Sequence, residues 1–150
     1  NIEFDHADIY ASIDEIKLTF KRLLNIVPRN GMAFVNGDEQ NCLDVSQNAP
    51  CPVTTVGFGT NNALQISNIN YDESSSSFSL DKESYTVPMT GEFNVRNAAM
   101  AAAAARFAGL TMQEVRDGLL SFEGVARRQE LKGEKNGIKV IDDFAHHPTA

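Results

Sequence analysis

The chain has 150 residues, a length that suits one domain, or one domain with part of a second. Hydrophobic residues make up 42% of it, but no apolar run is long enough to cross a bilayer, so we expect no membrane span. The formal net charge of -7 leaves no basic surface for nucleic acid, and a phosphate site must therefore be local.

The cysteines indicate the redox state of the thiols, and the chain ends indicate whether the sequence is part of a larger protein. Cys42 and Cys51 could bridge, but a lone pair without a secretory signal is typical of reduced thiols. The chain opens at Asn1 with residues typical of the end of a strand, and a new strand has barely begun before Ala150. We therefore expect an excised part of a larger protein.

The first half of the sequence has the rhythm of strand, helix and strand. Ser12 and Glu15 have the spacing of a capping box, and apolar residues at helical spacing then predict a helix over 13–27. A short apolar strand is then predicted over 32–36, a weak helical turn over 38–45 and a second apolar strand over 53–58. This order of strand, helix and strand is typical of a parallel sheet.

Between residues 64 and 88 the pattern changes to alternating apolar and polar residues. Such alternation predicts small antiparallel strands, which the polar segment 72–77 interrupts. The serine run 74–77 is interpreted as the tip of that loop.

Two helices are predicted next, joined as an αα-hairpin. The alanine-rich segment 94–108 favours a helix that ends at Gly109. Thr111 and Glu114 then predict a capping box for a second helix that ends near Phe122.

The C-terminal part is charged and predicts a β-hairpin over 128–142, because the pair Asn136-Gly137 favours a tight turn. The change of composition near Gly124 predicts a domain boundary. The predicted fold class is α/β: part of a mostly parallel sheet with flanking helices and a small antiparallel sheet, followed by the first strands of a second α/β domain. The two predicted parts are 1–124 and 125–150.

All three histidines lie in two short motifs, and His6 is in the first, Asp5-His6-Ala7-Asp8. This motif lies between a strand and a helix, the edge at which open α/β sheets bind ligands. A neutral imidazole beside carboxylates suits Mg²⁺ or Mn²⁺ that enters with a nucleotide. The same residues also suit a loop in which Asp8 binds the backbone and His6 lies on the surface.

Asn94 and Asn97 stand three residues apart in the first turn of a predicted helix, so their side chains share a face. A carboxamide presents a donor and an acceptor side by side, which matches the amino group and ring nitrogen of adenine. Helix capping by Asn94 is the alternative interpretation.

Arg127 and Arg128 begin a basic stretch, and a planar guanidinium suits a phosphate. A solvated charged hairpin is the alternative. The segment Gly57-Phe58-Gly59 is too short for a dinucleotide loop and is assigned to the end of a strand. The sequence contains no P-loop motif, so we expect that this chain alone cannot cradle a triphosphate.

Four short motifs follow one another along the whole chain. Together they closely resemble those of the Mur ligases, the ATP-dependent amide-bond ligases of peptidoglycan synthesis. The resemblance implies the second part of the central ATP-binding domain over 1–124 and the start of the C-terminal domain over 125–150. The phosphate loop would lie upstream, and the isolated chain would be inactive. The motifs are 1–8 (NIEFDHAD), 91–98 (GEFNVRNA), 126–128 (ARR) and 142–149 (DDFAHHPT).

The resemblance also implies roles for individual residues. His6 would bind Mg²⁺, Asn94 and Asn97 would contact the adenine of ATP, Arg128 would reach the γ-phosphate and Asp143 the ribose. The resemblance thereby implies catalytic roles for His6 and Arg128. His146 and His147 match a motif of the members that act on UDP-N-acetylmuramate.

The implied function is that of a cytoplasmic ligase that uses ATP and Mg²⁺ to join UDP-N-acetylmuramate to an amino acid or peptide amine. Phe4, Ala7 and Phe144-Ala145 resemble the members that recycle L-Ala-γ-D-Glu-meso-diaminopimelate, with the L-alanine-adding members as the alternative. A noncatalytic nucleotide-binding or interaction domain and a metal-dependent hydrolase are the remaining alternatives.

Overall fold

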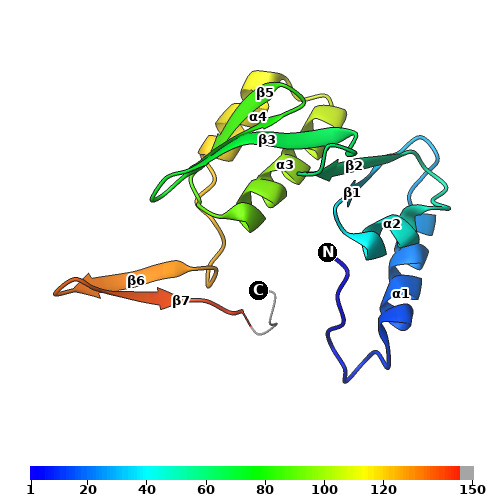
Figure 1. Cartoon of the computed structure of the whole chain (residues 1–150), viewed down its shortest axis with the longest axis horizontal. Helices are drawn as coiled ribbons and strands as arrows, with labels where there is room; N and C mark the ends of the chain where they lie inside the picture. The colour runs from blue at the N-terminus through cyan, green and yellow to red at the C-terminus, as the bar shows by residue number, and fades with distance from the viewer. Residues whose placement is uncertain (146–150) are drawn as a thin grey trace.

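The computed structural model describes residues 1–145 and shows a five-stranded sheet with helices beside it and a separate two-stranded hairpin (Figure 1). The predicted α/β class is confirmed. In chain order the elements are α1 (Ile13–Asn25), β1 (Ala33–Asn36), α2 (Gln40–Ser46), β2 (Val53–Gly57), β3 (Leu64–Tyr71), β4 (Ser76–Leu80), β5 (Glu83–Val87), α3 (Glu92–Phe107), α4 (Met112–Leu120), β6 (Glu130–Lys135) and β7 (Ile138–Asp142).

The large sheet has a parallel part and an antiparallel part, with strands in chain order from β1 to β5. β1 and β2 pair in parallel, with Asn36 opposite Val56 at their carboxyl ends. β3 joins β2 in parallel over two residue pairs, and β4 and β5 then continue the sheet as antiparallel strands. The loops that follow β1 and β2 therefore begin side by side.

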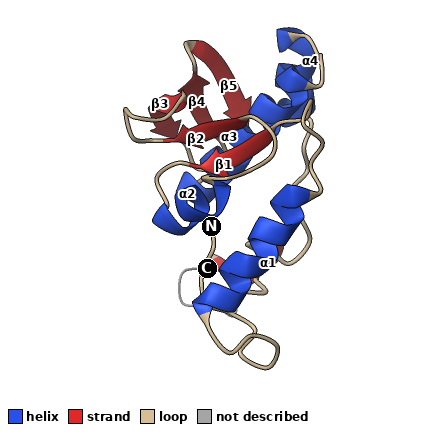
Figure 2. Ribbon diagram, turned by 90° about the vertical axis from the view of Figure 1, so that its right-hand side faces the viewer, coloured by secondary structure: helices blue, strands red, loops and turns tan. Residues whose placement is uncertain are grey.

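The main core lies between this sheet and α3, which runs across one of its faces (Figure 2). Val56 and Phe78 are almost fully buried on the sheet side. On the helix side, Ala99 and Ala102 are completely buried. Because alanine has a short side chain, the helix backbone can approach the strands closely, and the alanine-rich segment therefore serves packing as well as helix propensity.

A second, smaller core joins α1 and α2 to the start of the chain. Ile2, Ile16, Cys42 and Val45 are buried together in it. Cys42 and Cys51 are both free thiols, which confirms the prediction of reduced cysteines. Burial is the main reason that the pKa of Cys42 is raised to about 11, so this thiol stays protonated at neutral pH.

One prediction for α1 is wrong. The side chain of Ser12 makes no capping hydrogen bond, and the Glu15 carboxylate accepts from the backbone N–H of Ala11 at 2.7 Å. The helix itself is confirmed and ends at Asn25, two residues before the predicted end, where the backbone N–H of Ile26 donates to carbonyls of the last turn.

The interpretation of the serine run as a loop tip is wrong for its second half. Ser76 and Ser77 belong to β4, and Ser76 lies opposite Tyr71 of β3. Ser76 is completely buried and its Oγ donates to the carbonyl of Met89 at 2.8 Å. A hydroxyl with such a partner can lie in a core, so composition alone mislocated the turn.

The predictions for the two later helices and for the hairpin turn are confirmed. α3 and α4 pack as an αα-hairpin, and Thr111 and Glu114 form a complete capping box at the start of α4. Asn136 and Gly137 both have positive φ, at 53° and 77°, as a tight turn between β6 and β7 requires. No helix within residues 1–145 is both long and apolar enough to span a bilayer.

The two helix starts give a matched test of what a capping motif contributes. Thr111→Ala removes a hydroxyl that accepts from the backbone N–H of Glu114, and is expected to destabilise the fold by about 1 kcal/mol. Ser12→Ala removes a hydroxyl that caps nothing, so its effect should be clearly smaller. Urea unfolding of both variants measures the difference, and equal losses would show that Ser12 caps α1 in solution.

Candidate functional site

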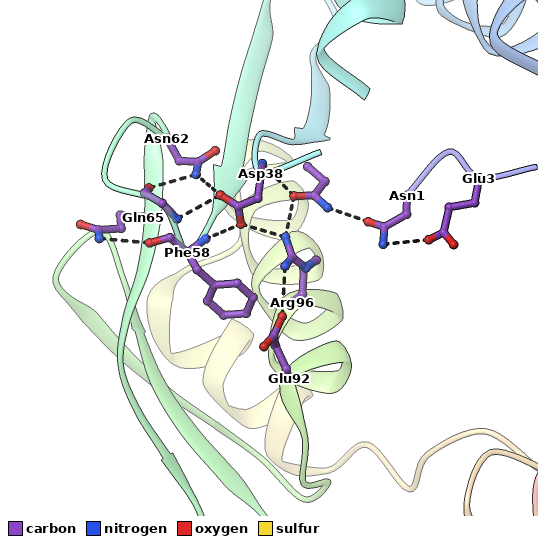
Figure 3. A network of polar contacts seen from close by, with 10 residues as sticks. Asn1, Glu3, Asp38, Phe58, Asn62, Gln65, Glu92 and Arg96 are labelled. Atoms are coloured by element: carbon purple, nitrogen blue, oxygen red, sulfur yellow. Dashed lines mark hydrogen bonds and ion pairs between the residues drawn. The ribbon is translucent and has the colours of Figure 1, made fainter. Parts of the chain in front are cut away.

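The loops after β1 and β2 meet at the carboxylate of Asp38 (Figure 3). This carboxylate accepts hydrogen bonds from the backbone N–H groups of Phe58, at 2.7 Å, and Gly59, at 3.0 Å. The amide of Asn62 donates to it at 2.7 Å. A single side chain from one strand end thus organises the turn that follows its neighbour.

Arg96 of α3 reaches the same point. Its guanidinium donates to Asp38 at 2.9 Å and to the side-chain oxygen of Asn36. It also lies over the ring of Phe58, 4.5 Å from the centroid, and 3.4 Å from a carboxylate oxygen of Glu92. The Arg96 side chain is only 15% exposed, so the charge is held in place by defined partners rather than by solvent.

The electrostatics of this strand-end cluster, defined as Asn36, Asp38, Phe58, Asn62 and Arg96, favour an ionised Asp38. Burial acts to raise the pKa of Asp38, but the hydrogen bonds that its carboxylate accepts outweigh burial and hold that pKa below its usual value. The cluster therefore contains a fixed anion and a fixed cation.

Two glycines make the close approach of these loops possible. A Cβ added at Gly37 would lie 1.9 Å from Oδ1 of Asn62, and one added at Gly57 would lie 2.5 Å from Oδ2 of Asp38. Neither glycine has a positive φ, so lack of space rather than backbone conformation requires them.

The cluster also holds the start of the chain. The amide of Asn36 donates to the side-chain oxygen of Asn1 at 2.6 Å, and Asn41 donates to the carbonyl of Ile2 at 2.8 Å. Together with the burial of Ile2, these bonds fix the segment that leads into the motif of His6.

His6 lies at the surface in a strained turn. Its φ is 54°, its backbone N–H donates to Asp5 at 2.7 Å, and its carbonyl accepts from Ile9 and Tyr10. The imidazole side chain is 61% exposed, with Nε2 3.9 Å from a carboxylate oxygen of Asp5. The loop thus presents an imidazole and a carboxylate on the same side.

The donor set around His6 suits part of a magnesium shell. Within residues 1–145, no three His, Cys, Asp or Glu side chains come together as a metal site. Mg²⁺ is usually held by one or two protein ligands, with waters and substrate phosphates completing the shell. His6 and Asp5 fit that incomplete role and could not hold the ion alone.

Asn94 and Asn97 lie on the first turns of α3. Asn94 does not cap the helix, because the cap position is Gly91, and its amide instead donates to the carbonyl of Thr90 at 2.8 Å. Asn97 is exposed and lines a cavity of about 370 Å³ between α3 and α4. The other walls of this cavity are mostly apolar and include Ala101, Leu119 and Phe122, with Glu114 as a charged lining residue.

The β6–β7 hairpin brings the other predicted residues together at its base. The backbone N–H of Gln129, next to Arg128, donates to Asp143 at 3.2 Å, and Asp143 also accepts from Ala145 at 2.7 Å. Arg128 is exposed, whereas the guanidinium of Arg127 lies 4.6 Å from the ring centroid of Phe144. His146 and His147 lie outside the described residues.

The predicted residues therefore form separate groups in the structure. Figure 1 shows the hairpin extending away from the five-stranded sheet, while Asn94 and Asn97 lie on α3 beside that sheet. The strand-end cluster was not predicted from the sequence. Its local signals are an acidic residue just after a predicted strand, Asp38, and an arginine between two asparagines, Arg96.

Comparison with known proteins identifies the family. Residues 1–105 match the Mur ligase middle domain. The chain belongs to the Mur ligase family. It is 42% identical over 156 residues to a UDP-N-acetylmuramate–L-alanine ligase of Clostridium acetobutylicum, and 40% identical over 151 residues to the corresponding ligase of Rubrobacter xylanophilus. These alignments cover 99% of this chain but 34% and 33% of the relatives, so the chain spans about a third of their length.

Solved structures support the same fold. A MurF structure from Acinetobacter baumannii superposes with a TM-score of 0.86 at 22% identity, covering 99% of this chain and 34% of that one. The UDP-N-acetylmuramate:L-alanyl-γ-D-glutamyl-meso-diaminopimelate ligase of Neisseria meningitides gives a TM-score of 0.68 at 30% identity, covering 83% and 39%.

The lowered pKa of Asp38 predicts how stability should depend on pH. A carboxyl with a lowered pKa stabilises the fold above its unfolded pKa of about 4, and this contribution is lost as pH falls through the folded pKa. At pH 7, Asp38→Asn should cost about 1–2 kcal/mol, because part of the side chain reaches solvent.

The cost of Asp38→Asn should shrink as the pH falls from about 5 through the lowered pKa of Asp38, because the wild-type carboxyl then becomes protonated as well. Urea unfolding at several pH values measures it. Glu73→Gln, an exposed change in the loop between β3 and β4, is the control and should alter stability little. A cost of Asp38→Asn that stays constant over this range would contradict the assignment.

Proposed function

We propose that this chain is the nucleotide-binding part of an ATP-dependent ligase that joins UDP-N-acetylmuramate to an amine. The observation that carries the proposal is similarity to UDP-N-acetylmuramate–L-alanine ligases over 99% of the chain. In this proposal, residues 1–124 are the second part of the central domain and 125–150 begin the C-terminal domain. The match of residues 1–105 to the middle domain supports the first assignment.

Asn94 and Asn97 are assigned to the adenine of ATP. The support is geometric, because both lie on the first turns of α3 and Asn97 lines a largely apolar cavity. A purine ring needs apolar walls for its faces and a carboxamide for its edge, and the cavity offers both.

Arg128 and Asp143 are assigned to the γ-phosphate and the ribose, and they lie at the base of one hairpin. The exposed guanidinium of Arg128 can approach a phosphate, while hydrogen bonds to Asp143 keep the two segments together. Because Arg128 and Asp143 are on the hairpin and the asparagines are on α3, a nucleotide would have to bridge the two parts.

The proposed reaction has two steps. The lactyl carboxylate of the muramate attacks the γ-phosphorus of ATP, the bond to the β-phosphate oxygen breaks, and an acyl phosphate and ADP form. The amine then attacks the acyl carbon, loses a proton and releases inorganic phosphate. Arg128 would offset charge on the transferred phosphoryl group, and Mg²⁺ held in part by His6 would supply further positive charge there.

Two acceptors are candidates, and the comparisons favour L-alanine. The curated relatives named for L-alanine addition reach 42% identity over 99% of this chain. Among solved structures, the tripeptide ligase of Neisseria meningitides and a murein peptide ligase of Psychrobacter arcticus reach 30% and 29%, and a UDP-N-acetylmuramate–alanine ligase of Thermotoga maritima reaches 20%. The tripeptide remains the second candidate because Phe4, Ala7 and Phe144-Ala145 resemble the recycling members.

The acceptor can be decided with the full-length protein supplied with ATP, Mg²⁺ and UDP-N-acetylmuramate. We expect a higher kcat/KM for L-alanine than for L-Ala-γ-D-Glu-meso-diaminopimelate, and the reverse ratio would assign the protein to recycling. A reaction without acceptor serves as the control. ATP turnover that needs no amine would indicate a hydrolase, and no nucleotide binding at all would indicate an interaction domain.

The roles of His6 and Arg128 can be tested by alanine substitution. Each group is assigned to charge that is transferred, so each variant should lose kcat by about 10²–10³-fold, with a smaller change in the KM for UDP-N-acetylmuramate. Arg29→Ala is the control. Arg29 is exposed in the turn before β1, at the opposite end of that strand from the strand-end cluster. Normal kcat in both variants would reduce His6 and Arg128 to surface residues.

A further inference from the structure

We propose that Arg96 is a positioning residue that sets the affinity for the adenine nucleotide without touching it. Anchored by Asp38, it fixes the first turns of α3 and thereby the side chains of Asn94 and Asn97. The inference rests on the proposed function, because it takes these two asparagines as adenine contacts.

The helix geometry separates Arg96 from the asparagines that flank it. At 3.6 residues per turn, residues 94 and 97 share a face, whereas residue 96 points to another side. That side is directed at the strand ends, where Arg96 contacts Asp38, Asn36 and Phe58 (Figure 3). Arg96 can therefore act on a ligand of Asn94 and Asn97 only through the backbone of α3.

The start of α3 depends on this anchor because it has no side-chain cap. Its cap residue is Gly91, with φ at 101°, and no side chain there accepts a hydrogen bond from the first turn. Glu92 is 62% exposed, so its contact with Arg96 at 3.4 Å contributes little orientation. The bonds from Arg96 to Asp38 and Asn36 are thus the polar contacts that tie the beginning of the helix to the sheet.

The anchor itself is rigid. Asp38 is held by two backbone N–H groups and by Asn62, and it therefore cannot follow Arg96 if the helix shifts. The guanidinium is planar and offers several donors in fixed directions, so it can satisfy Asp38 and Asn36 at once while lying over Phe58. A lysine at the same place would keep the charge but lose this fixed geometry.

Arg116 provides a matched control. Its guanidinium pairs with Glu83 at 2.9 Å, donates to the carbonyl of Ser84 at 3.0 Å and lies 6.0 Å from the ring centroid of Tyr85. Arg116 thus has an acidic, a carbonyl and an aromatic partner, but it ties α4 to β5 rather than the start of α3 to the strand ends. Its side chain is 39% exposed, so its loss should shift α4, which lines the same cavity, much less than the loss of Arg96 shifts α3.

The test uses the full-length enzyme and the variants Arg96→Met, Arg96→Lys and Arg116→Met. Calorimetry measures the Kd for ATP, and kinetics give KM for ATP and for UDP-N-acetylmuramate. Arg96→Met should weaken ATP binding about tenfold with little change in the KM for the muramate, and Arg96→Lys should recover part of the loss. Arg116→Met should leave ATP affinity unchanged. Amide hydrogen exchange without nucleotide should be faster over residues 92–97 in Arg96→Met alone.

Each outcome decides between the inference and the proposed function. If the wild type does not bind ATP, the proposed function fails, whatever the exchange shows. If the wild type binds ATP and Arg96→Met binds it equally well, or Arg116→Met weakens it as much, the positioning role is overturned. If Arg96→Met does not fold, Asp38→Asn and Arg96→Lys carry the test, and ATP affinities equal to the wild type in both would overturn the inference.

Discussion

The Asp38 carboxylate is the constraint on which the arrangement of this region depends, because three separate segments meet there. Its position is dictated by the parallel pairing of β1 and β2, which places two strand ends side by side. The backbone N–H groups of Phe58 and Gly59 donate to this carboxylate, and Arg96 donates to it from α3. Because this partly exposed carboxylate accepts hydrogen bonds from all of these donors at once, loop and helix geometry are coupled.

The hairpin offers a contrast, because its geometry is determined locally. Hydrogen bonds from the backbone of Gln129 and Ala145 hold Asp143, but the apolar side chains of the strands, Val140 among them at 59% exposed, have little cover within residues 1–145. The hairpin's own hydrogen bonds thus hold the segments of Arg128 and Asp143 together, without packing against α3. If a nucleotide bridges both parts as proposed, this difference suits an adenine site held on α3 and a phosphate-contacting hairpin that can approach it.

Local signals in the sequence predicted most of the elements, while a distant partner decided the position of Ser76. Apolar spacing located the helices, and Thr111 with Glu114 announced a capping box that forms. The same spacing of Ser12 and Glu15 forms no capping box, and the Glu15 carboxylate accepts from the backbone N–H of Ala11. Ser76 looked like a loop residue because its polarity is visible in the sequence, whereas the carbonyl of Met89 that permits its burial is not.

The residues of the candidate site also differ in whether the sequence alone could point to them. His6, Asn94 and Asn97 stand in short motifs, so residue type and spacing made them candidates for ligand contacts, beside the alternatives of a surface histidine and a helix cap. Asp38 and Arg96 are 58 residues apart, and only the pairing of β1 with β2 brings them together. A candidate contact residue can be proposed from the sequence because its chemistry must match a ligand, while a proposed positioning residue such as Arg96 matches only another part of the chain. Such partners can be sought before a structure exists in two places: among polar residues just after neighbouring parallel strands, and among charged residues on the first turn of the helix that crosses those strands.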